Sequence, residues 1–204
     1  MKILITGATG LIGKKLTTDL LSKGYSVNYL TTRKSKIKSS NQTNGYYWDP
    51  EKDIIDLQCF KNVDTIINLA GSNIAKRWTK PNKLEILKSR TQSLNLIKDS
   101  ISKNNIKIKK IISASAIGIY PSSYERVYSE NSNLISDNFL GKVVKEWELA
   151  VSSFNDLNIE IAIVRIGLVL SKDGGILSKT LFPIKLGFGS FFGSGSQWQS
   201  WIHI

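Results

Sequence analysis

With 204 residues, the chain has the length of one domain, or of one domain and part of another. Hydrophobic residues make up 41% of it, enough for a core, but no run of about eighteen apolar residues predicts a membrane span. The single cysteine, Cys59, excludes an internal disulfide and a cysteine-based zinc site. We therefore expect no metal, no membrane contact and a reducing, cytoplasmic setting.

The net charge of +12 raises the question of nucleic-acid binding. Lysines are spread along the whole chain, however, and gather only at residues 33–38 and 103–110. Neither cluster has the interleaved aromatic residues that single-strand binding requires. A solvated, lysine-rich surface is the favoured interpretation, and we expect no specific nucleic-acid partner.

The first thirteen residues predict a strand, a tight turn and the start of a helix. Residues 2–5 predict a short strand of mainly apolar residues, residues 6–10 are rich in glycine, and apolar residues then recur at helical spacing until Gly24. Gly7, Gly10 and Gly13 give the spacing G-x-x-G-x-x-G. Such a turn lets the backbone approach a phosphate at a helix N-terminus, so we favour dinucleotide binding over a purely structural turn.

Residues 26–32 predict the second strand, and its end bears on the choice of cofactor. In a dinucleotide-binding fold an acidic residue here binds the 2′-hydroxyl of NAD, whereas a basic one accommodates the 2′-phosphate of NADP. At this position the chain has Arg33 and Lys34 and no acidic residue, which favours NADP(H) over NAD(H). The alternative is a solvated loop. Residues 39–45 predict a polar loop and residues 46–50 a short third strand.

Residues 63–71 predict a continuous apolar strand whose last residue, Gly71, permits close approach of a cofactor. A helix is expected to follow, capped by Thr79 or Lys80 with Pro81 in its first turn, and to run to about residue 103. Arg90 lies on this helix, facing either the cofactor or solvent.

Residues 106–115 predict the fifth strand, and the hydroxyl-bearing Ser115 and Tyr120 follow at its carboxyl end. They suggest the edge of an active site, although capping serines at a strand exit are the alternative. A helix capped by Asp137 or Asn138 is expected to run to about residue 154, and an apolar strand over 159–170.

Beyond that strand the pattern is less regular. Gly174 and Gly175 should break the chain before a short helix to about residue 186. Residues 187–195 predict a loop at a substrate mouth, and residues 197–204 a last strand.

The alternation of strands and helices predicts an α/β fold: a doubly wound parallel sheet in three layers, of the Rossmann type. We expect residues 1–170 to form the NAD(P)-binding domain and residues 171–204 to begin an incomplete substrate-binding region.

The sequence also resembles the extended, atypical short-chain dehydrogenase/reductases, and within them the bacterial epimerase family proteins, described as NAD-dependent epimerase/dehydratase-like. The resemblance covers essentially the whole chain. It rests on residues 5–13, 68–71, 76–79, 89–90, 113–118, 147–148, 165–167, 173–177 and 201–204.

This resemblance implies roles for the residues of the glycine turn and of the later strand ends. Gly7, Gly10 and Gly13 would hold the pyrophosphate, with donors from Thr9, Leu11 and Ile12, and Arg33 would select the 2′-phosphate. Leu69, Ala70 and Gly71 would line the nicotinamide side, Ser115 would lie near the ring, and Arg90 and Gly167 would complete the cofactor site. The implied function is an NADP(H)-binding oxidoreductase or epimerase-like protein acting on an unknown small molecule.

Two departures from the family pattern qualify this prediction. The superfamily pairs a general acid/base tyrosine with a lysine four residues later, but Asn138 precedes Lys142 and Gly141 precedes Lys145. Ser115 and Tyr120 are then the only nearby hydroxyl pair, and a non-catalytic NADP(H)-sensing or protein-interaction module is the alternative function. Family members also continue beyond the position of Ile204, so the chain resembles a C-terminally truncated member.

Overall fold

The computed structural model describes residues 1–189 and 193–204. One seven-stranded sheet has the strand order β4-β3-β2-β1-β5-β6-β7, and every neighbouring pair is parallel except β3 with β4. Its strands are β1 (Lys2–Thr6), β2 (Ser26–Thr31), β3 (Thr43–Asp49), β4 (Ile54–Ile55), β5 (Thr65–Asn68), β6 (Lys110–Ala116) and β7 (Glu160–Ile166). The predicted doubly wound α/β fold is confirmed.

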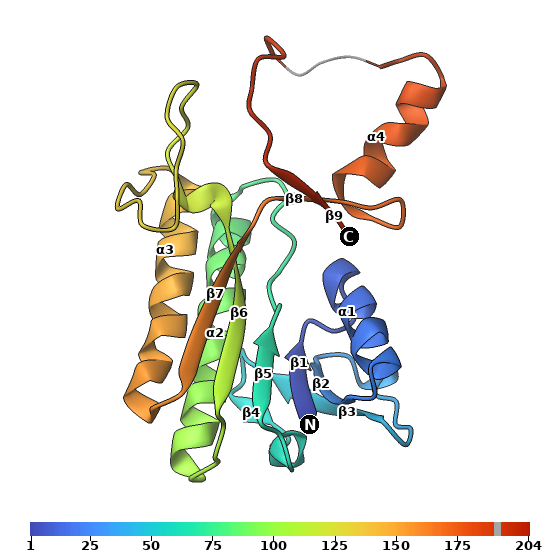
Figure 1. Cartoon of the computed structure of the whole chain (residues 1–204), viewed down its shortest axis with the longest axis vertical. Coiled ribbons are helices and arrows are strands. Elements are labelled where there is room, and N and C mark those ends of the chain that lie inside the picture. Colours follow the sequence, from blue (N-terminus) through green and yellow to red (C-terminus); the bar gives the residue numbers. More distant parts are fainter. Residues whose placement is uncertain (190–192) are drawn as a thin grey trace.

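Helices lie on both faces of this sheet, as Figure 1 shows. They are α1 (Leu11–Ser22), α2 (Lys80–Lys103) and α3 (Phe139–Ser152), while α4 (Gly175–Lys185) lies beyond the carboxyl edge of the sheet. Because side chains alternate along a strand, Ile3 of β1 packs with Leu16 of α1, whereas Leu4 faces the cluster that contains Ile97 of α2. Two cores, one on each face, therefore hold the three layers together.

The register brings the carboxyl ends of three central strands to one edge of the sheet. Thr6 at the end of β1 pairs with Asn68 at the end of β5, and Asn68 pairs with Ser113 in β6. In open parallel sheets, ligands bind outside the carboxyl ends of the strands. The loops that follow these strands are therefore the first place to look for a functional site.

The helix caps follow the sequence closely. The side chain of Thr79 accepts a hydrogen bond from the N–H of Asn82 at 3.4 Å, and that of Asn138 accepts one from Gly141 at 2.8 Å. Both residues were among the predicted caps. Gly24 has φ +81°, so it ends the first helix in a conformation that glycine adopts without strain.

Several strand boundaries differ from the prediction, and the last strand, β9 (Trp201–His203), is shorter than the expected residues 197–204. β3 begins at Thr43, inside the expected loop, because Thr43 continues the ladder opposite Val27 and Gly45 leaves room for the ring of Tyr29. β5 ends at Asn68 rather than at residue 71, and β6 begins only at Lys110. The short antiparallel strand β4 was not predicted.

The expected strand over residues 159–170 is divided at Gly167. The first part is β7, while β8 (Leu168–Leu170) leaves the main sheet and pairs in parallel with β9 (Trp201–His203). A Cβ at Gly167 would lie 2.5 Å from the carbonyl oxygen of Ser200, so glycine permits this crossing. The domain boundary at residues 170/171 stays a prediction.

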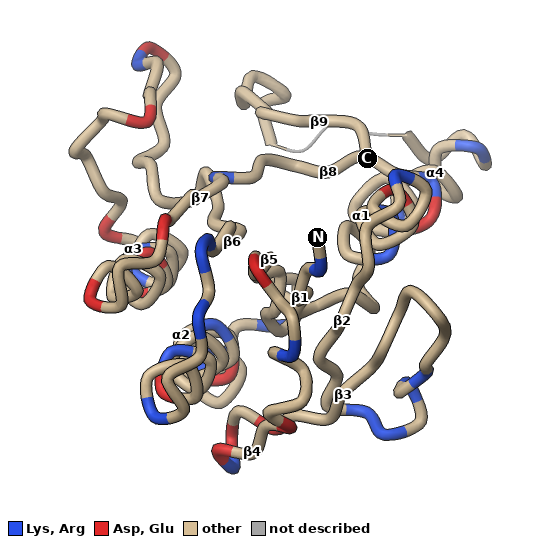
Figure 2. The backbone as a smooth tube through the Cα atoms, turned by 60° about the horizontal axis from the view of Figure 1, so that its bottom comes forward, with Lys and Arg blue, Asp and Glu red and all other residues tan. Residues whose placement is uncertain are grey.

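The predicted loop over residues 187–195 lies partly outside the described residues, which omit 190–192, and its place at a substrate mouth stays a prediction. No helix in the described ranges is long and apolar enough to cross a membrane. Basic positions are spread over the helices and loops, as Figure 2 shows, with acidic positions between them.

Candidate functional site

The glycine turn forms a tight cradle between β1 and α1. Gly7 has φ +71°, and a Cβ there would lie 2.6 Å from the carbonyl oxygen of Leu69. A Cβ at Gly13 would fall on the carbonyl of Gly7. Each position therefore requires glycine, and the turn is pressed against the backbone that follows β5.

The N-terminus of α1 carries no side-chain cap. Its N-cap is Gly10, no side chain accepts from the first turn, and the first turn has no acidic residue. Free N–H groups at a helix N-terminus, together with the helix dipole, favour an anion. The geometry thus fits the pyrophosphate of a dinucleotide, with Thr9, Leu11 and Ile12 at the mouth of the turn.

A buried hydrogen-bond network joins this turn to the ends of β5 and β6. The hydroxyl of Thr6 donates to Asn68 Oδ1 at 2.7 Å and accepts the N–H groups of Leu69 and Ala70, each at 3.1 Å. The Asn68 amide donates to Ser113 Oγ at 3.0 Å. Polar residues inside apolar strands were the sequence signal for this network, which our prediction missed. It fixes the path of residues 69–71 beside the turn.

Arg90 faces the end of β5 rather than bulk solvent. Its guanidinium donates to the carbonyl oxygens of Ile86 at 2.9 Å and Ser72 at 3.4 Å. Its Cζ atom lies 5.0 Å from the centre of the Trp147 ring on α3, a cation–π distance. A Cβ at Gly71 would lie 3.0 Å from the same Cζ, so Gly71 and Arg90 are in contact.

Ser115 and Tyr120 are brought into one network, but through two residues that the sequence reasoning had not assigned to the site. The Ser115 hydroxyl donates to Glu148 at 2.5 Å, and Glu148 accepts Arg165 Nε at 2.9 Å and Nη2 at 2.8 Å. Arg165 Nη1 donates to the Tyr120 hydroxyl at 2.7 Å. The motifs at residues 147–148 and 165–167 contained the signal for both.

The charges in this network stabilise each other. Burial raises the pKa of Glu148, but the hydrogen bonds from Arg165 and Ser115 and the nearby Arg165 charge outweigh it, so the pKa lies below its usual range. The hydrogen bond from Arg165 to Glu148 raises the pKa of Arg165. Glu148 and Arg165 are therefore both ionised at neutral pH, and the Glu148 carboxylate accepts the hydrogen bond from the Ser115 hydroxyl.

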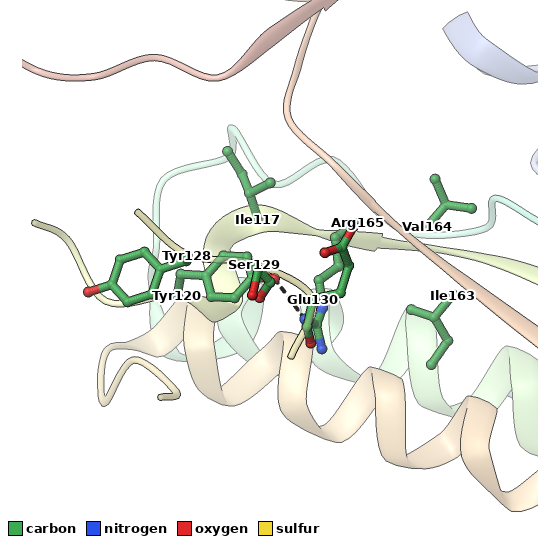
Figure 3. A pocket seen from close by; sticks show the side chains of 8 residues that line it. All are labelled: Ile117, Tyr120, Tyr128, Ser129, Glu130, Ile163, Val164 and Arg165. Carbon is green, nitrogen blue, oxygen red and sulfur yellow. Dashed lines mark hydrogen bonds between the residues drawn. The ribbon is translucent and has the colours of Figure 1, made fainter. Parts of the chain in front are cut away.

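The Tyr120 hydroxyl both accepts and donates a hydrogen bond. It accepts from Arg165 and donates to the main-chain carbonyl of Ser129 at 3.0 Å. Its ring stacks on Tyr128 with centroids 5.3 Å apart. Both rings and Arg165 line an open pocket, shown in Figure 3. No residue of the glycine turn lines that pocket, so it is separate from the candidate phosphate site. Ser115, only 3% exposed, does not line it either.

The end of β2 places Arg33 on the surface, with its own N–H bonded to Thr31 Oγ1 at 3.2 Å. Beside it, the ammonium of Lys34 lies 5.3 Å from the ring centre of Tyr47 on β3. Two cations thus follow β2, as the sequence predicted. Gly167, by contrast, is explained by its packing against Ser200, and its contact with a cofactor stays a prediction.

Among the described residues, no group of three or more His, Cys, Asp or Glu side chains gathers in a way that would hold a metal ion. On α3, the positions four residues before Lys142 and Lys145 are the N-cap Asn138 and the buried Gly141. The tyrosine–lysine pair of the superfamily therefore has no counterpart on this helix.

The comparisons with known proteins agree with this geometry. The sequence profile of the NAD dependent epimerase/dehydratase family matches residues 3–204. The chain belongs to this family. An epimerase family protein of Staphylococcus aureus (strain N315) is 34% identical over 201 residues, which is 98% of this chain and 66% of that protein. The family member described here thus spans about two thirds of the length of such relatives.

Two solved structures are similar over the whole chain. A human epimerase family protein, crystallised with NADPH, has a TM-score of 0.79 and 28% identity, with 66% of its chain covered. A nucleoside-diphosphate sugar epimerase from Corynebacterium glutamicum has a TM-score of 0.79 and 29% identity, with 41% of its chain covered. Both support the Rossmann-type fold of this family member.

Proposed function

We propose that this protein binds NADP(H) and acts as an oxidoreductase or epimerase-like enzyme on a small molecule. The observation that carries the proposal is the uncapped N-terminus of α1 behind a turn in which Gly7 and Gly13 leave no room for a side chain. Family membership and the NADPH complex of the human relative support it. Bound NADP(H) would supply the hydride acceptor or donor.

The cofactor would lie along the carboxyl edge of the sheet. Gly7, Gly10 and Gly13 would hold the pyrophosphate, and Arg33 with Lys34 would bind the 2′-phosphate beyond β2. Leu69, Ala70 and Gly71 would line the nicotinamide side, because they follow β5 and lie against the turn.

Proton transfer would fall to the hydroxyl groups that follow β6. Ser115 donates its own proton to Glu148, which leaves its oxygen as an acceptor for a substrate hydroxyl. Arg165 orients Tyr120 through the 2.7 Å hydrogen bond. Full hydride-transfer activity in both Ser115→Ala and Tyr120→Phe would contradict these assignments.

The cofactor choice is tested by titrating NADPH and NADH into the wild type and into Arg33→Ala, with nicotinamide fluorescence as the readout. We expect tighter binding of NADPH in the wild type, and loss of that preference in Arg33→Ala. Arg126→Ala, at an exposed position in the loop before α3, is the matched control and should keep it. Equal binding of NADPH and NADH to the wild type would contradict the NADP(H) assignment.

A non-catalytic NADP(H)-sensing or protein-interaction module is the second candidate. Two observations favour it: α3 lacks the tyrosine–lysine pair, and both sides of the Tyr120 hydroxyl are already engaged. Cofactor binding without turnover across a panel of carbonyl compounds and nucleotide sugars would support it over the enzyme.

The proposal also includes a cytoplasmic location, in line with the single free and buried Cys59. It includes no specific nucleic-acid partner, in line with the mixed charges of Figure 2. A weak, strongly salt-dependent association with nucleic acid would be incidental to the function.

A further inference from the structure

Arg90 is a partly buried cation with no anionic partner among the residues that the structure describes. Within residues 1–189 and 193–204 no carboxylate forms an ion pair with it, and its hydrogen bonds go to two main-chain carbonyls. Burial lowers the pKa of Arg90, because no nearby negative charge compensates the cost of desolvation. Buried charges in proteins are normally paired, so the missing counter-ion calls for an explanation.

Two further polar groups beside Arg90 are also unsatisfied. Ser72 Oγ and Trp147 Nε1 are buried atoms without a hydrogen-bond partner, and the Trp147 side chain is only 7% exposed. Arg90 touches both residues, through the Ser72 carbonyl and across the face of the Trp147 ring. An indole N–H and a guanidinium only donate, and a hydroxyl can donate, so this group of donors suits an anion.

The group lies beside the backbone that follows β5. Gly71 is exposed, and a Cβ there would lie 3.0 Å from the guanidinium carbon, so Arg90 reaches the exposed main chain at this point. Gly71 follows Leu69, whose carbonyl touches the glycine turn at Gly7. A ligand bound beside the nicotinamide side of the cofactor would therefore reach Arg90.

The sheet order distinguishes this place from the anion sites already proposed for the cofactor. β1 lies between β2 and β5, so Arg33 and Arg90 follow strands on opposite sides of it. The pyrophosphate is assigned to the turn after β1 and the 2′-phosphate to the end of β2. Neither anionic group of the cofactor then needs the donors that follow β5.

We propose that Arg90, Ser72 and Trp147 form a subsite for an anionic group, a carboxylate or a phosphate, on the substrate. The inference rests on the proposed function and narrows it, because it makes the substrate an acid or a phosphate ester. Arg90 would pair with the anion, and the absence of a side chain at Gly71 lets the guanidinium lie against the exposed main chain that follows β5.

The test uses inorganic phosphate and acetate as separate probes, titrated calorimetrically into the full chain saturated with NADPH. We expect one of them to bind the wild type, and to bind Arg90→Gln at least tenfold more weakly, or about 1.4 kcal/mol. Arg90→Lys should recover part of the affinity. Arg126→Gln, which loses the same charge at an exposed site, should match the wild type. Circular dichroism verifies that each variant is folded.

Gly71→Ala is a second test variant in case Arg90→Gln fails to fold. Its methyl group would displace the Arg90 guanidinium and should also weaken binding of the phosphate or acetate probe. Equal binding of the probes to the wild type and the variants, or no binding to any of them, would overturn the subsite. Arg90-dependent binding of a probe that occurs without NADPH but is lost in the NADPH-saturated chain would assign Arg90 to the cofactor instead and overturn the substrate inference.

A wild type that fails to bind NADPH contradicts the proposed function separately. Titrations of phosphate and acetate without cofactor then test the subsite. Binding that is weaker in Arg90→Gln than in the wild type supports the subsite, and equal binding or no binding overturns it.

Discussion

Arg165→Met tests whether the Glu148–Arg165 pair holds the end of β6 to α3 and β7. The change keeps an apolar stem but removes four hydrogen bonds: two to the Glu148 carboxylate, one to the Tyr120 hydroxyl and one to the main-chain carbonyl of Glu130. Removing one partner of a buried pair costs about 3–5 kcal/mol. These side chains are 23% and 13% exposed, so water offsets part of that cost and we expect about 2–3 kcal/mol. For a chain of this length the melting temperature would fall by roughly 4–12 °C.

The penalty should depend on pH with a defined sign. In the wild type the pKa of Glu148 is lowered, so its stabilisation is present above the unfolded value near 4.3 and is lost as pH falls through the folded pKa. In Arg165→Met, burial without the cation would raise the pKa of Glu148 instead. Protonation of Glu148 in acid then removes the uncompensated buried charge from the variant. The loss in the free energy of unfolding relative to the wild type is therefore largest at neutral pH and smaller in acid.

Urea denaturation followed by tryptophan fluorescence at pH 7 and at pH 4.5 measures this difference. Lys98→Met is the matched control, because its partner Asp156 is 73% exposed and such pairs contribute at most about 1 kcal/mol. A penalty in Arg165→Met that is the same at both pH values would refute the reasoning. So would a penalty no larger than that of the control.

Three further predictions concern the turn and the strands beside it. Gly7→Ala should lower the free energy of unfolding by about 2–4 kcal/mol and weaken NADPH binding, because it strains a residue at φ +71° and collides with the Leu69 carbonyl; urea denaturation and fluorescence titration measure both effects. Thr6→Val removes the hydroxyl that accepts the Ala70 N–H, so the exchange of that amide should accelerate, whereas Thr6→Ser should retain its protection. Gly45→Ala should cost about 1–3 kcal/mol because its methyl group meets the Tyr29 ring, and an equal cost in a Tyr29→Leu background would contradict this contact.

The sequence predicted the order of the main elements and both helix caps. Periodicity identified α1, α2 and α3 because each buries one apolar stripe, and the glycine turn was recognisable because its spacing has a steric cause. The division of residues 159–170 was not predictable from apolar character alone, because β7 and β8 are equally apolar. Only the close approach of Ser200 to Gly167 shows why the chain leaves the sheet there.

The site was predicted in part for similar reasons. Ser115 was identified by its place after a strand, but its partner Glu148 lies 33 residues away, and the distance between them depends on how α3 packs. Arg90 was left facing either the cofactor or solvent, because the helix period does not fix which side chain reaches Gly71. Contacts between distant residues are set by tertiary packing, which local sequence patterns do not specify.

The central claim, that the N-terminus of α1 binds the phosphates of a dinucleotide, is tested most directly at Gly10. This N-cap residue has φ −77° and ψ 178°, which other residues also adopt. A Cβ there would lie 3.2 Å from the Gly7 carbonyl oxygen, a close contact that the two variants compared below share. Aspartate and asparagine both cap helices well, but only aspartate adds a negative charge where the pyrophosphate would lie.

The measurement is a fluorescence titration of NADPH into the wild type, Gly10→Asn and Gly10→Asp, with the melting temperature of each. We predict that both variants stay folded and that Gly10→Asp binds NADPH more than about tenfold more weakly than Gly10→Asn. Equal binding to all three proteins would show that the dinucleotide phosphates do not lie at the N-terminus of α1.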